Sequence, residues 1–220
     1  PLYSSAASDV YKRQVYGARV SLTVAAAAVV LAGVLGVAIG VGVAFLGRRL
    51  ESAAIRVVDV FVSLPEIFVA LVVLAFIGGN LPTLVATIGV LYAPQFARVA
   101  WGVARGIRAR EHVLAASSLG AGTGWIIWHE VLPNMRSIIA VQASFTFSFA
   151  MLLEAGLSFL GLGVRPPVPS WGQMVGSLKD YLFTNPWPVL VPALALFFTV
   201  LAVNVLGDWL QDALNPELQR

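Results

Sequence analysis

The chain consists mostly of long apolar runs that are separated by short polar segments. The run from Leu22 to Leu46 carries no charged residue, and as a helix it would be about 37 Å long at about 1.5 Å per residue. About 20 apolar residues suffice to cross a bilayer. The pattern therefore predicts five membrane spans, at about residues 22–46, 57–77, 81–101, 137–160 and 187–207.

All five runs are expected to be helices. Within lipid, only helices and closed barrels satisfy the backbone hydrogen-bonding groups, and these runs are too long and continuous for barrel strands. The turn "GGNLPT" at residues 78–83 separates two of them. The sequence thus predicts an all-α integral membrane protein, a polytopic helical bundle in which residues 15–220 form one transmembrane domain.

Composition supports this class and excludes others. Hydrophobic residues make up 59% of the chain and charged residues 11%, and the mean hydropathy is +0.85. The chain has no cysteine, which excludes disulfides and thiolate metal sites. The net charge of +3 comes from basic residues between the spans, where membrane topology explains them, so we expect no nucleic-acid partner.

The arginines also predict the orientation. Nine of them lie in segments 47–56 and 98–136 and in the C-terminal tail, whereas at most five basic residues lie on the opposite side. The positive-inside rule places those segments and the C-terminus in the cytoplasm. Residues 1–14 show neither a signal sequence nor periodicity, so we expect them to be non-native or disordered. We also expect one earlier span, which would make six, of which five are present.

The polar segment "EHVLAASSLGAGTGWIIWHEVLPN", residues 111–134, interrupts the apolar pattern. Residues 105–119 contain good helix formers, and three glycines at 120, 122 and 124 then break the helix. Trp125 and Trp128 follow on a short amphipathic segment that Pro133 is expected to end. Two short helices would meet at a glycine elbow. The residues alone leave two interpretations open: a docking surface for a protein partner, or a helix lying on lipid headgroups.

Four segments resemble a known family. Ala115-Ala116, then three residues, Gly120, nine residues and Glu130-Val131-Leu132-Pro133 resemble the cytoplasmic "EAA" loop of permease subunits in binding-protein-dependent ABC importers. The segments "YGARVSL" (16–22), "EAGLSFLGLGVRPPVPSWGQM" (154–174) and "GDWLQDALNPEL" (207–218) resemble the dipeptide, oligopeptide and nickel branch of these permeases. Together they are distributed along the chain from residue 15 to residue 220 and anchor the resemblance over this range.

The resemblance implies a type I ABC importer permease in the cytoplasmic (inner) membrane. Its implied partners are two cytoplasmic ATPases, a second homologous permease and an extracytoplasmic binding protein that would meet residues 163–188. On the residues alone, a plain connector between the last two spans is the other interpretation of that segment. The implied cargo is di- or oligopeptides, or nickel; ATP and Mg would be used by the ATPases, and this chain would bind no cofactor. The loop, about residues 104–135, would insert the part near residues 120–129 into an ATPase groove. The implied coupling residues are Glu111, Ala115, Ala116, Gly120, Trp125, Trp128, Glu130, Leu132 and Pro133.

Two residues depart from the family pattern. Leu114 stands where the loop's name-giving acidic residue is expected, and Glu111, one turn earlier, is a partial substitute. Glu130 takes a position that is usually apolar or histidine. Both departures leave the expected helix, elbow and helix intact, but they affect the contacts available for docking.

Two carboxylates fall within spans. Glu66 lies inside the second span, where a charge is costly, so a pathway or gating role competes with a kink at Leu64-Pro65 that leaves Glu66 satisfied locally. Glu154 near the end of the fourth span is a second pathway candidate, or braces the adjacent glycine-rich turn. His112 and His129 both fall in the polar loop, so no metal site is expected in the spans.

Other functions have less support. The spans contain no nucleophile–base pair and no H-E-x-x-H motif, so we expect no enzyme. The chain lacks G-x-x-x-x-G-K-[ST], so the energy of an ATP-driven process must come from a partner. A secondary transporter or another helical membrane protein that is not coupled to ATP stays as the alternative, although no inverted repeat is evident.

Overall fold

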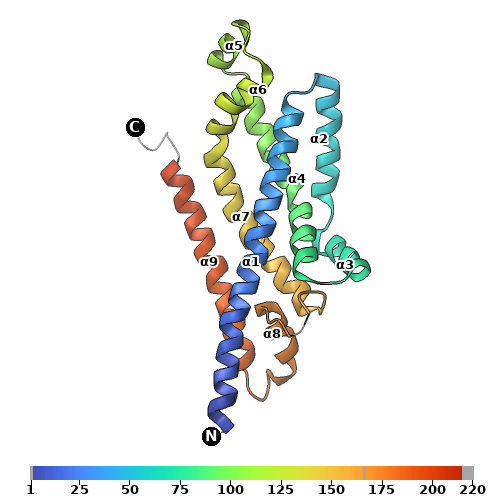
Figure 1. Ribbon diagram of the computed structural model, residues 1–220, viewed down its shortest axis with the longest axis vertical. Helices are drawn as coiled ribbons and strands as arrows, with labels where there is room; N and C mark the ends of the chain where they lie inside the picture. Colours follow the sequence, from blue (N-terminus) through green and yellow to red (C-terminus); the bar gives the residue numbers. More distant parts are fainter. Residues whose placement is uncertain (1, 166, 215–220) are drawn as a thin grey trace.

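The computed structural model describes residues 2–165 and 167–214, and Figure 1 shows an elongated bundle of helices. No strand occurs among the described residues. The helices are α1 (Leu2–Ala44), α2 (Arg48–Ser63), α3 (Glu66–Ile77), α4 (Leu81–Arg108), α5 (Glu111–Ser118), α6 (Thr123–Ile126), the π-helix η1 (Ile127–Val131), α7 (Leu132–Phe159), α8 (Trp171–Leu178), the 3₁₀-helix η2 (Lys179–Tyr181) and α9 (Trp187–Leu214).

Four helical segments of the described chain are long and apolar enough to cross a membrane. They are Lys12–Ala44, Leu81–Arg108, Thr123–Phe159 and Trp187–Ala213, which correspond to the first, third, fourth and fifth predicted spans. α1 begins at Leu2, so residues 2–14 belong to the same helix, although we expected them to be non-native or disordered. Their foreign origin stays a prediction. The last residues of the 207–218 segment lie outside the described residues.

The second predicted span, 57–77, is wrong as a single helix. α2 and α3 meet at an angle of 82°, and together they count as one further span only if the bent pair crosses the membrane. The cause is Pro65, which has no N–H to donate and forces the preceding Leu64 into an extended conformation with ψ 135°. This is the kink that the sequence offered as an alternative.

The centre of the bundle is formed by α1 and α4, and α4 lies beside the C-terminal half of α1 (Figure 1). Gly36 and Gly40, one helical turn apart on α1, face the backbone of α4 at Ala93 and Ala97, and a side chain at either glycine would overlap that backbone. Small residues at this spacing allow two membrane helices to approach closely, so that dispersion forces hold them together. The main core of the bundle gathers around this contact, where Phe96 of α4 is fully buried.

A second, smaller core lies at the end of the bundle that carries the polar loop. It joins Val41 of α1, Ile107 of α4, Val113 of α5 and Val131 of η1. These side chains are nearly or fully buried. The loop is therefore anchored by its own apolar side chains to the helices that carry it.

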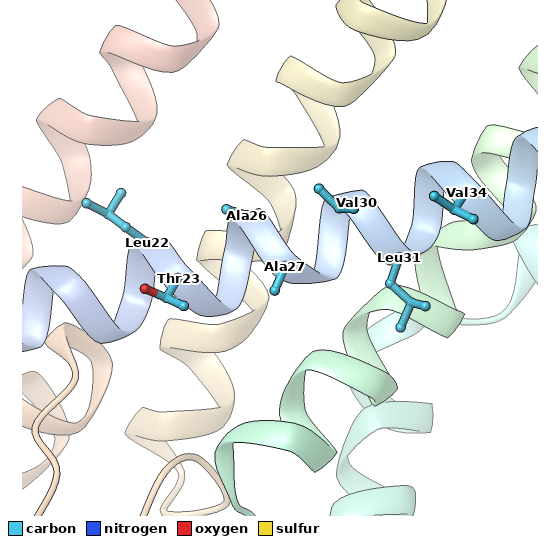
Figure 2. Close-up of a pocket in the computed structure, with 7 residues that line it drawn as sticks. All are labelled: Leu22, Thr23, Ala26, Ala27, Val30, Leu31 and Val34. Carbon is cyan, nitrogen blue, oxygen red and sulfur yellow. The ribbon is translucent and has the colours of Figure 1, made fainter.

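One face of α1 is open. Figure 2 shows side chains from Leu22 to Val34 along a shallow groove of about 770 Å³ on this face. The polar side chain in the groove, Thr23, donates its hydroxyl hydrogen to the carbonyl oxygen of Arg19 at 2.6 Å. The groove is therefore apolar in character and suits a hydrophobic neighbour.

The segment between α7 and α9 folds back onto the bundle at the end opposite the polar loop (Figure 1). Ser170 caps α8 by accepting a hydrogen bond from the backbone N–H of Gln173 at 3.2 Å. Trp171 is 5% exposed, and its indole N–H donates to the carbonyl oxygen of Gln14 at 3.2 Å. Its backbone N–H donates to the hydroxyl of the buried Ser21 at 3.3 Å. Helix α8 is thus a packed part of the bundle, not a loose connector.

Candidate functional site

The predicted polar loop projects from one end of the bundle as α5, a glycine turn and α6 (Figure 1). The expected single helix at 105–119 is wrong, because α4 ends at Arg108 and α5 begins at Glu111. The expected stop at Pro133 is also wrong. Pro133 lies in the first turn of α7, where the missing N–H has no helical acceptor to lose, and the helical path continues from Thr123 to Phe159 through the π-turn η1.

The elbow forms where the sequence predicted it. Gly120 has φ +91°, a left-handed conformation that side chains rarely adopt. Its N–H donates to the carbonyl of Ser117, and the N–H of Ala121 donates to the carbonyl of Ala116, both at 3.0 Å. This pair of hydrogen bonds is the Schellman arrangement that ends a helix at a glycine. The elbow is therefore set by local backbone chemistry.

The tip of the loop is apolar and exposed. Leu119 is 90% exposed, Trp128 71% and Trp125 47%. A hollow of about 440 Å³ is lined by Ala116, Leu119, Gly120, Ala121, Gly122 and Trp125. Large apolar side chains in water are unfavourable for a free surface, so this tip suits contact with a partner.

The structure brings some of the predicted coupling residues together and leaves others apart. Ala116, Gly120 and Trp125 line the same hollow, whereas Glu111 and Ala115 lie exposed on α5. Trp128 and Glu130 lie on the π-turn, and Leu132 and Pro133 lie at the start of α7. The nine residues share one region but not one surface.

Sequence reasoning missed a side-chain contact across the elbow. The Nε2 atom of His112 on α5 lies 3.4 Å from Oε2 of Glu130 on the π-turn. Glu130, which departs from the family pattern, therefore has a partner that faces it across the elbow. The ring of His129 stacks on Trp125 with centroids 4.7 Å apart, and its Nδ1 lies 3.0 Å from the Trp125 carbonyl oxygen.

Polar contacts tie α4 to α1 and α2 near the loop. Glu51 of α2 accepts a hydrogen bond from the indole N–H of Trp101 at 2.9 Å and lies 3.6 Å from Arg105. Arg108 donates to the carbonyl oxygen of Ala44 at 2.7 Å. Because α4 leads directly into α5, these contacts connect the loop to the first helices of the bundle.

Glu66 is not satisfied by its own turn. It is the first residue of α3, and its Oε1 accepts a hydrogen bond from Nε2 of Gln95 on α4 at 2.6 Å. Tyr92, also on α4, lies close enough to the same carboxylate to interact with it. The local satisfaction that accompanied the kink interpretation is therefore wrong, because the partners come from a neighbouring helix. Sequence reasoning missed these partners because Gln95 lies 29 residues from Glu66 in the chain.

Glu154 is fully buried on α7, and its Oε1 accepts a hydrogen bond from the Ser158 hydroxyl at 2.7 Å. Its Oε2 has no hydrogen-bond partner among the described residues. Glu154 is thus hydrogen-bonded within its own helix, α7, whereas Glu66 is hydrogen-bonded to α4, so the two carboxylates do not share a partner. No three His, Cys, Asp or Glu residues within 2–165 and 167–214 form a group that could hold a metal ion.

Comparisons with known proteins agree with this architecture. Residues 32–220 match the family described as "Binding-protein-dependent transport system inner membrane component". The chain is 36% identical over 211 residues to the dipeptide transport system permease protein DppC of Alkalihalophilus pseudofirmus, covering 96% of this chain and 69% of that protein. It is 40% identical over 213 residues to a putative peptide permease protein of Brucella ovis, covering 96% of this chain and 70% of that protein.

The fold also matches a solved transporter. A chain of the MetNI methionine ABC transporter, in an inward-facing conformation, superposes with a TM-score of 0.76 and 19% identity, covering 92% of this chain and 96% of that chain. At this identity the likeness shows the fold alone. The predicted helical bundle of the ABC importer permease kind is confirmed.

Proposed function

The chain belongs to the family of inner membrane components of binding-protein-dependent transport systems, and we propose that it is the permease subunit of an ATP-driven importer whose cargo is peptides. Family membership and the apolar helices make it a multi-pass inner membrane protein. The peptide cargo is supported by the similarity to two peptide permeases at 36% and 40% identity. The alternative of a secondary transporter is favoured by none of these observations.

The polar loop is the proposed contact with the ATPases. The observation that carries this proposal is the exposed apolar tip, where Leu119 is 90% exposed beside a hollow at the Gly120 elbow. A surface of this kind would be covered by a protein groove, and the tip is fastened by its buried side chains to α1, α4 and α7. A partner that closes on ATP would therefore move these helices through the loop, provided it contacts the loop differently in its two states.

The proposed assembly contains two cytoplasmic ATPases, which use ATP and Mg, and a second homologous permease; this chain itself would bind no cofactor. The positive-inside rule supports a cytoplasmic loop and C-terminus. The opposite end would then meet the extracytoplasmic binding protein. In support, Phe183 is 96% exposed and Trp187 68% exposed beside the packed helix α8, so an ordered platform presents aromatic side chains there.

Glu154 has a proposed structural role. Its carboxylate bonds to Ser158, one turn further along α7, and Gly163 packs so closely on Ser158 that a side chain at Gly163 would overlap it. The carboxylate thus lies beneath the glycine-rich turn that follows α7. We propose that Glu154 braces this turn and does not contact cargo.

The coupling proposal is tested by Gly120→Arg. An arginine here is strained by the left-handed backbone and fills the exposed hollow, so co-purification with the ATPases and peptide uptake should both be lost. Gly106→Arg is the matched control, because Gly106 lies on α4 and outside the part near residues 120–129 that is proposed to enter the ATPase groove. Gly106 is exposed in helix α4, and an added Cβ would meet no described atom within 4 Å, so the same charge is added without strain.

Both variants should insert into the membrane and elute as monodisperse species, because neither site is packed. Unchanged co-purification of the ATPases with Gly120→Arg would refute the loop as the docking surface. Equal losses in Gly120→Arg and Gly106→Arg would also refute it, since the effect would then follow from added charge.

A further inference from the structure

A pocket lies between the bent pair α2–α3 and helix α4. It has a volume of about 350 Å³ and is lined mainly by apolar side chains, among them Phe61, Val69, Val73 and Leu91. Glu66 is the charged residue among the described residues that line it. A carboxylate at the wall of an apolar pocket in a membrane protein is costly and suggests a function.

The position of the Glu66 carboxylate is fixed by neutral groups. Gln95 donates an amide hydrogen to it at 2.6 Å, and the side chain of Tyr92, which is 2% exposed, lies beside it. Glu66 is also the first residue of α3, where the helix dipole favours a negative charge. These three interactions orient and stabilise a carboxylate, but none of them supplies a positive charge.

Within the described residues, the Glu66 carboxyl group has hydrogen-bonding neighbours but no cationic partner. Among the residues that the structure describes, no Lys, Arg or His side chain forms an ion pair with Glu66. Arg98, one turn beyond Gln95 on α4, is 3.4 Å from Asp59. The basic side chain that follows Gln95 on α4 is therefore engaged with another carboxylate.

A proline of α4 lies in the same wall. Pro94 lies inside α4 and has no N–H, so the carbonyl of Val90, four residues earlier, lacks its helical donor. Val90 and Pro94 both line the pocket. The wall thus combines an oriented carboxylate with a surface that is otherwise largely apolar.

This chemistry fits a small organic cation that donates hydrogen bonds. A hard metal ion is a poorer fit, because Ca²⁺ and Mg²⁺ need about six oxygen ligands and the pocket offers one carboxylate. A primary ammonium group carries three N–H donors and one positive charge, and the apolar walls suit an adjoining side chain. A peptide's amino terminus, with an ordinary pKa of about 7.7–8.0, is mostly protonated at neutral pH.

We propose that Glu66, held by Gln95 and Tyr92, binds the terminal ammonium group of the cargo peptide during its passage. This assignment rests on the peptide cargo proposed above. It makes Glu66 a cargo contact and Gln95 and Tyr92 its positioning residues. The apolar walls of the pocket then contact the first side chain of the peptide without selecting a particular residue type.

The test uses the purified importer complex in lipid nanodiscs, without binding protein, and two probes. One is radiolabelled trialanine; the other is propionyl-alanyl-alanine, in which a hydrogen replaces the ammonium group. The wild-type complex should bind trialanine about tenfold more tightly or better, because the charged partner is lost in the second probe. Glu66→Gln should weaken trialanine binding by a similar factor and leave the other probe unchanged.

Two further variants control for structure. Glu66→Asp keeps the charge and should keep a preference for trialanine. Val73→Ala enlarges the same pocket without changing charge, so it should shift the affinity for both probes by the same factor. Glu66→Gln keeps an acceptor oxygen for Gln95, and co-purification of the ATPases reports whether it is folded.

Several results would overturn the assignment. They are equal binding of the two probes by the wild-type complex, absence of trialanine binding up to about 10 mM, or an unchanged preference in Glu66→Gln. ATP-driven uptake of trialanine, measured with binding protein present, separates the two proposals. Normal uptake with no probe preference removes only the Glu66 assignment, whereas absence of uptake by the wild-type complex removes the peptide importer itself.

Discussion

The two ends of the molecule are both rich in glycine and tryptophan, yet the structure uses these residues in opposite ways. At the end that carries α8, Trp171 is 5% exposed and a side chain at Gly172 would overlap the backbone of Ala155. At the loop end, Trp128 is 71% exposed, and an added Cβ at Gly124 would meet no described atom within 4 Å. The first end is packed by its own chain, and the second is left open.

The difference shows how the same residue types serve stability in one place and contact in another. A buried tryptophan contributes to folding through its large apolar surface, whereas an exposed one leaves that surface available to a partner. Likewise, a glycine can be needed because a neighbouring backbone leaves no room for a side chain, or because the turn needs a left-handed conformation. Substitutions at matched positions should therefore separate folding from docking.

The largest expected effect comes from the tryptophans. Trp171→Ala should lower the free energy of unfolding by about 3–5 kcal/mol, because it empties a packed site and removes the hydrogen bond from the indole to the Gln14 carbonyl. Trp128→Ala should change the free energy of unfolding by less than about 1 kcal/mol, because the side chain is 71% exposed, but it should weaken ATPase binding. Unfolding by denaturing detergent and ATPase co-purification measure the two quantities.

Two results would contradict this comparison of the two tryptophans. If Trp128→Ala destabilised the chain as much as Trp171→Ala, the loop tip would be part of the folded core in solution. If Trp171→Ala left stability unchanged, helix α8 would not be held to α1 by this side chain.

The glycines should give a smaller contrast of the same kind. Gly172→Ala places a methyl group against the Ala155 backbone, which cannot move aside like a flexible side chain, and should cost about 1–3 kcal/mol. Gly124→Ala lies in the short helix α6 with open space around it, so it should be neutral or slightly stabilising. Thermal unfolding of both variants in one detergent provides the measurement; equal shifts would contradict the packing of α8 on α7.

Much of the fold could be predicted because long apolar runs leave few alternatives in lipid. The runs that became α1, α4, α7 and α9 were recognisable from hydropathy alone. Two elements were not. α2 begins at Arg48, nine residues before the expected start. This start was missed because the first residues of the helix are charged, and a search for apolar runs leaves them out. α8 was hidden in the segment expected to connect the last two spans, since its contacts are with α1, α7 and α9.

The candidate sites were less predictable, because their geometry depends on residues that are distant in sequence. The loop elbow was found through Gly120, whose effect on the backbone is local. The partners of Glu66 were missed, since Gln95 lies on α4 and is brought to α3 by the bend at Pro65. The contact between Trp171 and Ser21 is likewise a result of folding, with no local signal in either segment.

The smallest expected effect concerns the pair that joins the two sides of the elbow, His112 and Glu130. The two side chains are 52% and 24% exposed and 3.4 Å apart, so water screens their attraction and the coupling energy should be below about 1 kcal/mol. A double-mutant cycle with His112→Gln and Glu130→Gln, read by thermal unfolding, measures it. In both single variants the free energy of ATPase binding should change more than the free energy of unfolding, because the pair links α5 to the π-turn on the exposed side of the elbow. Coupling larger than about 2 kcal/mol would mean that this elbow is held together like the packed end of the molecule. An ATPase affinity that is unchanged in both variants would mean that Glu130 is a neutral departure from the family pattern.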